Sequence, residues 1–341
     1  MKKKLVAVML CMMMTAGLAG CSSGEEAKEN KGQDKDGKIL IAQSMPTLNN
    51  PWYVEFAEGS KNMAEHLGIE IVQVTNPETN AWSPETQISK IENLIAKNPD
   101  VIEIDPTSTD GINGVVDEAR NKDIPVVVSG TKVSTEVDAA IIGDNSQGGQ
   151  LAGEFMGKAL DGKGKVVVLL GTPGRDVFQA REDGFKEALG EYEGIEIVAE
   201  QIANSERAEA VSVTETILQA NPDIDAIWAS NDEMALGAVE ALRSINKEGK
   251  VIVGGFDATP DAVTAIQNGE MHFSVNQIPY EMGVRAIGIS YLLAQGKEIP
   301  SDDIALDLSL VSYENVEDYL NNQEENNKKV IEQVTEEYGL K

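Results

Sequence analysis

Side chains that both donate and accept hydrogen bonds follow nearly all predicted β-strands of this 341-residue chain. Two asparagines and two adjacent aromatic residues, Trp52 and Tyr53, follow the first strand, and IDPTSTD, GTPGRD and FDATPD follow later ones. Because ligands of open parallel sheets bind beyond the carboxyl ends of the strands, we expect these segments to meet. Hydroxyl groups need paired donors and acceptors, and the C–H face of a sugar packs on an aromatic ring. The pattern therefore favours a polyhydroxylated ligand.

A second interpretation applies to each of these positions taken alone. Asn and Asp are also common in turns and at helix N-termini. Trp52 or Tyr53 could simply begin the next helix and pack on the core. The gathering of six polar segments at one predicted edge favours ligand binding over this alternative.

Motifs for catalysis are weak in this sequence. His66 and His272 are its two histidines, and neither has a second His or Cys at a spacing that binds zinc. The chain contains neither a G-x-S-x-G elbow nor a G-x-x-x-x-G-K-[ST] loop, and GTPGRD lacks the spacing of a dinucleotide fingerprint. Asp105, Asp257 and Glu233 could form a carboxylate pair, which a sequence does not distinguish from ligand-binding residues. We therefore predict no enzyme activity, no cofactor and no metal site.

The first residues, MKKKLVAVMLCMMMTAGLAGC, have the pattern of an export signal. Three lysines precede a short apolar run, and L-A-G-C at its end resembles the lipobox of bacterial lipoproteins. We predict a signal peptide over residues 1–20 and lipidation at Cys21, with a plain signal peptide as the alternative. Cys11 lies in the removed segment, so the mature chain would keep no cysteine for a disulfide.

The mature chain is strongly acidic. Removing residues 1–20 deletes three of the 28 basic residues and none of the 57 acidic ones, which leaves a balance of −32. Such a surface disfavours nucleic acid as a partner. Residues 21–37 contain no large apolar residue and are predicted to be a flexible tether. Residues 321–341 form a polar C-terminal tail, expected to be a solvated and frayed helix.

Ten short apolar runs alternate with amphipathic stretches from Lys38 onward. Most runs are continuous, as in parallel strands that are covered on both faces. The predicted strands are 38–44, 69–74, 101–105, 125–130, 139–144, 165–171, 195–202, 226–230, 251–257 and 271–276. The segments between them predict helices, one of which begins at Ser83-Pro84 and another of which ends at Gly68. The strands divide near Asp144 into two groups of five, which predicts two α/β lobes with doubly wound parallel sheets.

Four segments in order resemble the ribose-binding protein family of bacterial ABC importers: LNNPWYVEF, NPDIDAIWASNDEMALGAVEAL, VIVGGFDATPD and SVNQIPYEMG. The likeness covers about residues 38–310. It implies the type I periplasmic binding protein fold, in which a three-strand hinge joins two lobes. With crossings near residues 144, 277 and 307, it implies an N-terminal lobe of 38–143 and 278–306 and a C-terminal lobe of 144–277 and 307–320. LacI-type repressors share this fold but carry an N-terminal DNA-binding segment where this chain has the lipobox.

Seven residues match the sugar-binding positions of the family. Two of them occupy its aromatic stacking positions, and the others are polar. The predicted ligand-binding residues are Asn50, Trp52, Tyr53, Arg181, Asn231, Asp257 and Gln277.

The sequence departs from the family at two positions. The family has Asp-Arg after its fourth strand, where this chain has Gly130-Thr131, and Ser205 stands where the family has a third aromatic residue. Losing an acid–base pair removes a charge-assisted hydroxyl contact. Asp105, Arg175 and Phe178 are candidates to compensate for this loss. We therefore expect a ligand other than ribose: a sugar alcohol, a cyclitol, a furanose or a differently oriented pentose.

The resemblance implies a monomeric solute-binding lipoprotein of an ABC importer. It would capture a carbohydrate or polyol between its lobes and deliver it to a membrane permease. Lipid at Cys21 would hold it on the outer face of the cell membrane or in the periplasm. The alternative is a sensor that presents its ligand to a membrane kinase or chemoreceptor.

Overall fold

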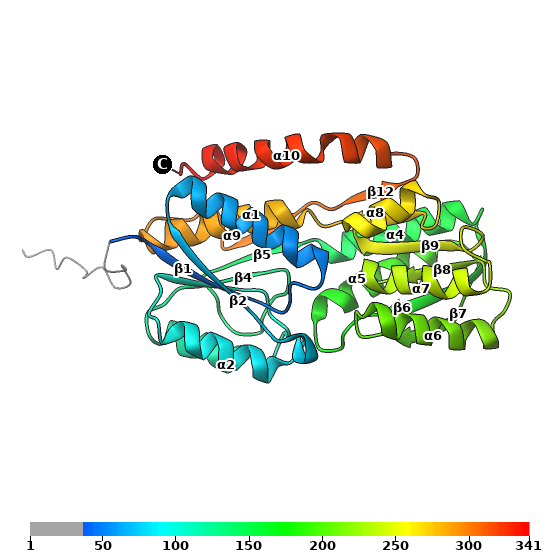
Figure 1. Ribbon diagram of the computed structural model, residues 1–341, viewed down its shortest axis with the longest axis horizontal. Coiled ribbons are helices and arrows are strands. Elements are labelled where there is room, and N and C mark those ends of the chain that lie inside the picture. Colours follow the sequence, from blue (N-terminus) through cyan, green and yellow to red (C-terminus); the bar gives the residue numbers. More distant parts are fainter. Residues whose placement is uncertain (1–36, 341) are drawn as a thin grey trace, which may run out of the picture. The chain divides into compact units, whose positions relative to one another are not determined.

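The computed structural model describes residues 37–340, so the predicted signal peptide, Cys21 and nearly all of the tether lie outside the described residues. Two six-stranded sheets form the framework (Figure 1). The first sheet has the order β11-β5-β4-β3-β1-β2, and all of its strands are parallel. Its strands are β1 (Leu40–Met45), β2 (Glu70–Thr75), β3 (Val101–Ile104), β4 (Val126–Ser129), β5 (Ala139–Gly143) and β11 (Asp303–Leu306).

The second sheet has the order β12-β10-β9-β8-β6-β7, and only its edge strand β12 is antiparallel to its neighbour. Its strands are β6 (Lys163–Leu170), β7 (Gly194–Ile202), β8 (Ala226–Ala229), β9 (Ile252–Asp257), β10 (Phe273–Asn276) and β12 (Ser309–Ser312). The prediction of two doubly wound parallel-sheet units is thus confirmed. Strands β11 and β12 were not among the ten predicted strands, because each has only four residues and little continuous apolar sequence.

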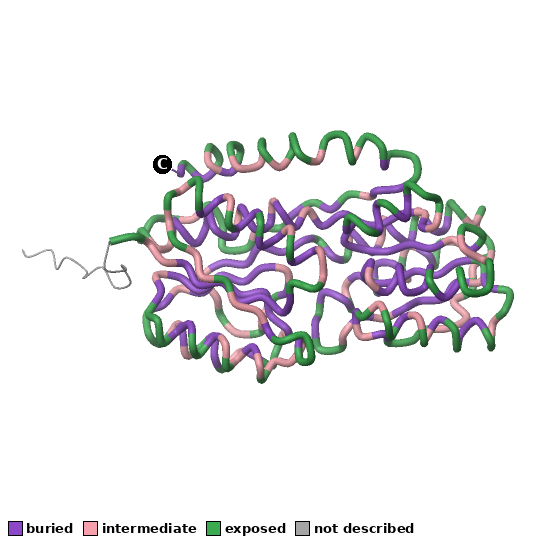
Figure 2. Tube along the Cα trace, viewed as in Figure 1, coloured by how far each residue is buried: buried purple, intermediate pink, exposed green. Residues whose placement is uncertain are grey.

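Helices cover both faces of each sheet. Those of the first sheet are α1 (Pro51–Leu67), α2 (Pro84–Ile95), α3 (Asn113–Arg120) and α9 (Pro279–Ala294), with a short 3-10 helix, η1 (Glu78–Asn80). Those of the second are α4 (Asn145–Ala159), α5 (Asp176–Leu189), α6 (Arg207–Ala220), α7 (Asp232–Ser244) and α8 (Pro260–Gln267). The buried residues lie along the strands and on the sheet-facing sides of the helices, as Figure 2 shows. Burial on both faces explains why the strand sequences are continuously apolar.

The chain passes between the two sheets at three places: after β5, between β10 and α9, and between β11 and β12. The extent of the two lobes as separate domains stays a prediction. Among the described residues, no helix is both long and apolar enough to cross a membrane.

Glycines allow close packing in two pairs of helices that carry site residues. A Cβ atom on Gly59 of α1 or Gly283 of α9 would lie 2.1 or 2.2 Å from a backbone oxygen of the other helix. The same holds for α4 and α5, where a Cβ on Gly149 or Gly184 would lie 2.1 or 2.2 Å from a backbone oxygen. These distances are too short for any side chain, so α1 and α5 each lie in direct backbone contact with a neighbour. Their N-terminal ends are thereby held in place at the edge of each sheet.

The C-terminal segment is helical, as expected, but one side of the helix is covered. Helix α10 (Val316–Glu337) begins earlier, and its sparse apolar residues lie on one side. Val316 joins an apolar cluster of the second sheet, whereas Val334 and Leu340 are buried in a cluster of the first. Tyr319, Val330 and Ile331 are partly buried against the same clusters, so one face of this otherwise polar helix is covered.

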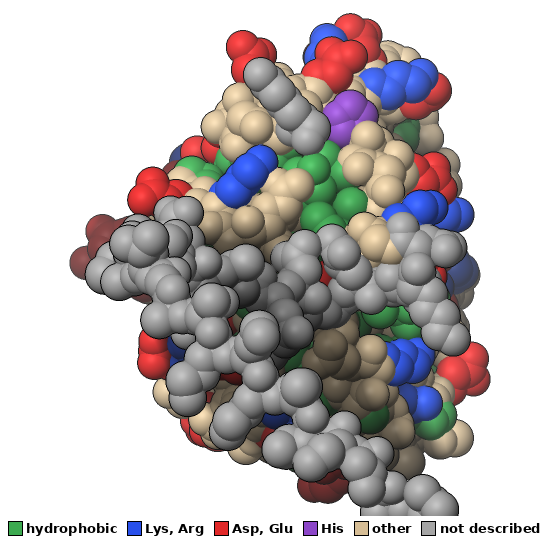
Figure 3. All heavy atoms as spheres, turned by 90° about the vertical axis from the view of Figure 1, so that its left-hand side faces the viewer, with side chains coloured by type: hydrophobic (Ala, Val, Ile, Leu, Met, Phe, Trp, Pro, Cys, Tyr) green, Lys and Arg blue, Asp and Glu red, His purple; other side chains and the backbone are tan. Residues whose placement is uncertain are grey.

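Charged side chains cover the outer surface. Figure 3 shows acidic side chains beside basic ones over the described part of one face. Several form exposed pairs one helical turn apart, such as Lys122 with Glu118 at 2.7 Å. Exposed pairs of this kind contribute little to stability, about 0–1 kcal/mol each.

A row of polar side chains, buried except for Gln73, crosses the first sheet. Gln73 Nε2 donates to Gln43 Oε1 at 2.7 Å, and Gln43 Nε2 donates to Ser60 Oγ at 2.9 Å. Glu103 is paired with Gln43 in the parallel register of β1 and β3 and has no exposed surface. Burial raises the pKa of Glu103 to about 8, although the side chains of Ser129 and Gln43 act in the opposite direction.

We expect Glu103→Gln to stabilise the protein increasingly as pH rises. The pKa of Glu103 is higher in the folded protein than in the unfolded chain. Burial of this side chain therefore does not reduce the free energy of unfolding of the wild type below about pH 4.5, where the carboxyl is protonated in both states. The wild type then loses stability as pH rises through about 8, by a few kcal/mol in total. Urea unfolding at pH 5 and pH 8.5 measures the difference between variant and wild type, with the exposed Glu240→Gln as the control for removing a charge. A difference that stays constant between the two pH values would contradict this explanation.

Candidate functional site

A small cavity of about 30 Å³ lies where the carboxyl ends of the two sheets meet. The residues that line it include all seven predicted ligand-binding residues, the three candidates for compensation and Gly130. They are Asn50, Trp52, Tyr53, Trp82, Asp105, Gly130, Arg175, Val177, Phe178, Arg181, Asn231, Asp257 and Gln277. Thr131, which follows Gly130, accepts a hydrogen bond from Arg175.

Aromatic side chains line the first-sheet side of the cavity. Asn50 caps α1 by accepting a hydrogen bond from the Trp52 backbone at 2.9 Å, and Pro51 occupies the first turn. This geometry places Trp52 and Tyr53 at the start of the helix, with their ring centroids 4.8 Å apart and their planes at 78°. Trp52 also stacks on Phe56 at 5.4 Å. Both rings are buried among core residues and also line the cavity, so core packing and ligand contact are compatible here.

Arg175 enters from the segment between β6 and α5 and bonds to the first-sheet side. Its Nη2 atom lies 2.8 Å from Asp105 Oδ1 and donates to Thr131 Oγ1 at 2.6 Å. Burial raises the pKa of Asp105 to about 7, and the positive charge of Arg175 opposes this effect. Arg175 Nη2 also donates to the Tyr53 hydroxyl at 3.4 Å, and burial raises the pKa of that hydroxyl.

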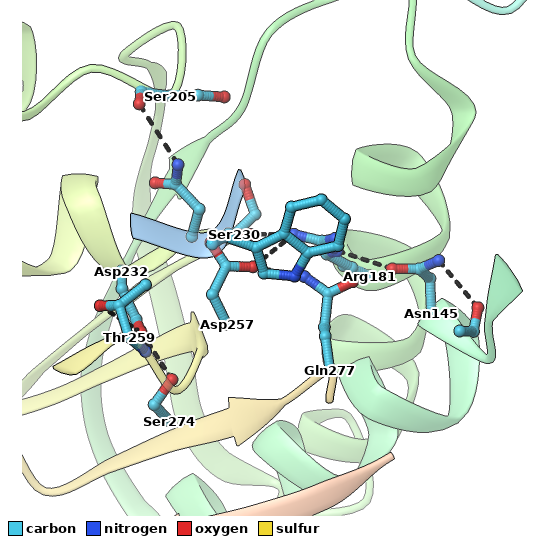
Figure 4. Close-up of polar contacts among 12 residues, drawn as sticks. Asn145, Arg181, Ser205, Ser230, Asp232, Asp257, Thr259, Ser274 and Gln277 are labelled. Carbon is cyan, nitrogen blue, oxygen red and sulfur yellow. Dashed lines mark hydrogen bonds and ion pairs between the residues drawn. The ribbon is translucent and has the colours of Figure 1, made fainter. Parts of the chain in front are cut away.

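Arg181 of α5 organises the second-sheet side (Figure 4). It donates from Nε to Asn145 Oδ1 at 2.8 Å and from Nη1 to the Ser230 carbonyl at 2.9 Å, and it lies 3.6 Å from Asp257 Oδ1. Burial lowers the pKa of Arg181 to about 10, against the attraction of Asp257. Burial raises the pKa of Asp257 to about 8, against the charge of Arg181, and the Gln277 amide donates to the same carboxyl oxygen.

The segments after β8 and β9 are tied together beneath the cavity. Asn231 caps α7 by accepting from the Met234 backbone at 3.0 Å, and its amide donates to the Ser205 carbonyl at 3.2 Å. Asp232, directly after it, accepts hydrogen bonds from the Thr259 backbone at 2.7 Å and from Ser274 Oγ at 2.6 Å. These bonds hold Asn231 and the segment after Asp257 in fixed positions.

Two lining residues, Trp82 and Val177, were missed in the sequence. Trp82 lies in the segment between β2 and α2, which was not among the polar segments expected at the ligand. Its ring is 6.0 Å from that of Tyr53 and 5.0 Å from the Arg175 guanidinium carbon. The signal was an aromatic residue directly before the Ser83-Pro84 helix start. Val177 carries no comparable signal.

The two halves touch across the cavity mouth. The Thr109 backbone donates to the Gly174 carbonyl at 3.0 Å, and the Asp176 backbone donates to Thr109 Oγ1 at 3.1 Å. Trp82 Nε1 donates to Glu206 Oε1 at 3.2 Å. The structure therefore describes a closed arrangement of the cavity. Across residues 37–340, no group of three or more His, Cys, Asp or Glu side chains is arranged to hold a metal ion.

Comparison with known proteins agrees with this architecture. A family model described as a periplasmic binding protein domain matches residues 41–298. The ribose import binding protein RbsB of Haemophilus influenzae is 30% identical over 311 residues, which are 91% of this chain and 99% of that protein.

Two solved structures are also similar, and both are described as ABC transporter solute-binding proteins. That from Actinobacillus succinogenes 130z, with bound D-allose, has a TM-score of 0.78 and 31% identity, covering 83% of this chain and 100% of that one. That from Bacillus halodurans C-125, with bound myo-inositol, has a TM-score of 0.78 and 27% identity, covering 86% and 99%. The relatives are binding proteins and not enzymes, as predicted for this chain.

Proposed function

Because the chain belongs to the periplasmic binding protein domain family, we propose that it is the extracytoplasmic sugar- or polyol-binding component of an ABC importer. The observation that carries this proposal is the cavity between the two sheets. Amide, carboxylate and guanidinium groups on both sides supply donors and acceptors, and Trp52 and Tyr53 supply apolar faces. Asn50, Arg181, Asn231, Asp257 and Gln277 are the proposed polar contacts.

Ligand capture follows from the connection of the two halves. Only three chain segments join the sheets, so the halves can separate and close around a ligand. The ligand favours closure only to the extent that it binds the closed form, with contacts to both sides, more tightly than the open form. The closed form then docks on a membrane permease and delivers its ligand.

We propose a ligand other than ribose. The motivating residues are Gly130 and Thr131, which replace the acid–base pair of the family. A sugar alcohol, a cyclitol, a furanose or a differently oriented pentose fits this change. The two solved relatives bind D-allose and myo-inositol.

Titration calorimetry of the purified full-length chain tests the proposal. The panel contains D-ribose, D-allose, D-arabinose, myo-inositol and a pentitol. We expect saturable, one-to-one binding of at least one compound, with D-ribose weaker than another member. Tight binding of D-ribose would contradict the choice of ligand, and the absence of binding by every compound would contradict the function.

The site of action follows from the N-terminal sequence. We propose that residues 1–20 are removed and that diacylglycerol on Cys21 holds the protein at the outer face of the cell membrane, as a monomer. An intact-mass measurement of the membrane-extracted protein shows whether both changes occur. Presentation of the ligand to a membrane kinase or chemoreceptor is the second candidate role, because a sensor would recognise the same closed form.

A further inference from the structure

An acid–base pair is present in the cavity although Gly130-Thr131 supplies none. Asp105 follows β3 of the first sheet, and Arg175 precedes α5 beside the second sheet. Their side chains meet at 2.8 Å, and both are buried. The pair therefore has one member on each side of the cavity.

The Asp105 carboxylate has an unused acceptor. Its Oδ1 atom receives Arg175, whereas Oδ2 is buried and has no hydrogen-bond partner among residues 37–340. Asp105 lines the cavity. A buried acceptor without a partner is unfavourable, and a ligand hydroxyl that donates to Oδ2 would offset this cost.

Gly130 makes room for this carboxylate. Its φ is +70°, and a Cβ atom there would lie 2.2 Å from Asp105 Oδ2. A side chain at position 130 would thus occupy the space of the Asp105 carboxylate. The Asp105 carboxylate in this position therefore requires a glycine at position 130.

Arg175 is held by groups of the opposite side. Besides Asp105, its guanidinium bonds to Thr131 Oγ1 at 2.6 and 3.0 Å and to the Tyr53 hydroxyl at 3.4 Å. Its guanidinium carbon lies 5.0 Å from the Trp82 ring and 5.5 Å from the Phe178 ring. Of these contacts, only Phe178 belongs to the same half of the chain as Arg175. The guanidinium can occupy this place only when the cavity is closed.

The charges in the cavity balance. Its charged lining residues are two arginines, Arg175 and Arg181, and two aspartates, Asp105 and Asp257. Each arginine is paired with one aspartate. When both aspartates are ionised, the lining carries no net charge for an anionic ligand to neutralise.

We propose that Asp105 and Arg175 form a split grip for two adjacent hydroxyls of an uncharged sugar or polyol, a role that rests on the proposed function. Asp105 accepts one hydroxyl through Oδ2 on the first-sheet side. Arg175 donates to the neighbouring hydroxyl and arrives only on closure. Its contribution consequently lies in the rate of ligand dissociation, because association involves the open form.

The test uses the full-length chain and the tightest compound of the panel above. Calorimetry and stopped-flow fluorescence compare wild type, Arg175→Gln, Arg175→Lys and Asp105→Asn. We expect Arg175→Gln to weaken binding about 10- to 100-fold, mainly through faster dissociation, because a charge-assisted hydrogen bond is lost. Arg175→Lys keeps the charge without the planar fork and should recover only part of the affinity.

Singly deoxygenated analogues of the same compound identify the hydroxyls. One analogue lacks the hydroxyl that Arg175 contacts, so wild type and Arg175→Gln should bind it with equal affinity. A second analogue lacks the hydroxyl that Asp105 contacts, so wild type and Asp105→Asn should bind it with equal affinity. Arg207→Gln is the matched control, since Arg207 is paired with Glu233 at 2.9 Å and does not line the cavity. We expect it to retain wild-type affinity.

Three outcomes would overturn the inference. The first is wild-type affinity and dissociation in both Arg175→Gln and Asp105→Asn, each confirmed to be folded by its thermal melt. The second is a sugar acid that binds more tightly than every neutral compound. The third is a wild type that binds nothing in the panel, which contradicts the proposed function as well and is thereby distinguishable from the first two. If Arg175→Gln does not fold, Asp105→Asn and Arg175→Lys decide in the same way.

Discussion

Trp52→Ala is expected to abolish measurable sugar binding. Trp52 begins α1 at the cavity, and its ring is fixed between Tyr53 and Phe56. A rigid aromatic contact at the centre of a site is commonly worth about 2–4 kcal/mol, or at least about thirtyfold in affinity. Titration calorimetry with the tightest panel compound measures the loss.

A core substitution on the same helix separates binding from stability. Trp52→Ala also leaves a cavity, so its unfolding free energy should fall by about 3–5 kcal/mol. Met63→Ala removes a fully buried side chain of α1 that does not line the cavity. It should lose stability and keep its affinity. Near-normal affinity in folded Trp52→Ala would show that the Trp52 ring serves only the core.

Arg181→Met is expected to reduce both binding and stability. Arg181 is buried and joins Asn145, the Ser230 carbonyl and Asp257, so its loss leaves the Asp257 carboxylate without a countercharge. Removing one partner of a buried pair typically costs about 3–5 kcal/mol. The remaining carboxyl would be held protonated to a higher pH than the pKa of about 8 that it has beside Arg181. Urea unfolding at about pH 6 and about pH 9.5 should therefore show a larger loss at the higher pH, because the wild-type carboxyl is ionised only above about pH 8.

A double variant tests this explanation. Adding Asp257→Asn to Arg181→Met removes the unpaired charge, so stability should recover while ligand affinity remains low. Recovery of both would mean that Arg181 acts only as the countercharge of Asp257. Failure of the double variant to regain stability would contradict the buried-charge explanation.

Several features were predictable because they depend on short stretches of sequence. Continuous β-branched runs indicated strands covered on both faces, and both sheets have apolar clusters on each face. Gly68 marked the end of α1, where the structure has a left-handed glycine. The rule for strand ends then placed the polar segments at one edge. The seven predicted contacts do line one cavity, although their contact with a ligand stays a prediction.

Other features were not predictable because they depend on contacts between distant residues. Trp82 reaches the cavity only because its segment packs beside Tyr53 and Arg175. Residues 321–341 look polar, and the burial of Val334 requires the surface of α9. The number of strands was underestimated because β11 and β12 are short and are defined by pairing with β5 and β10.

The sequence alone determined the α/β class, the two sheets and the chemical character of the cavity, because apolar periodicity and cap residues act locally. Tertiary structure decided which charged groups meet. Arg175 and Asp105 are 70 residues apart, and the sequence around one of them does not indicate that it pairs with the other. Their pairing depends on the closed arrangement of the two halves and on the space that Gly130 leaves. These residues from separate segments therefore become a single site only in the folded protein.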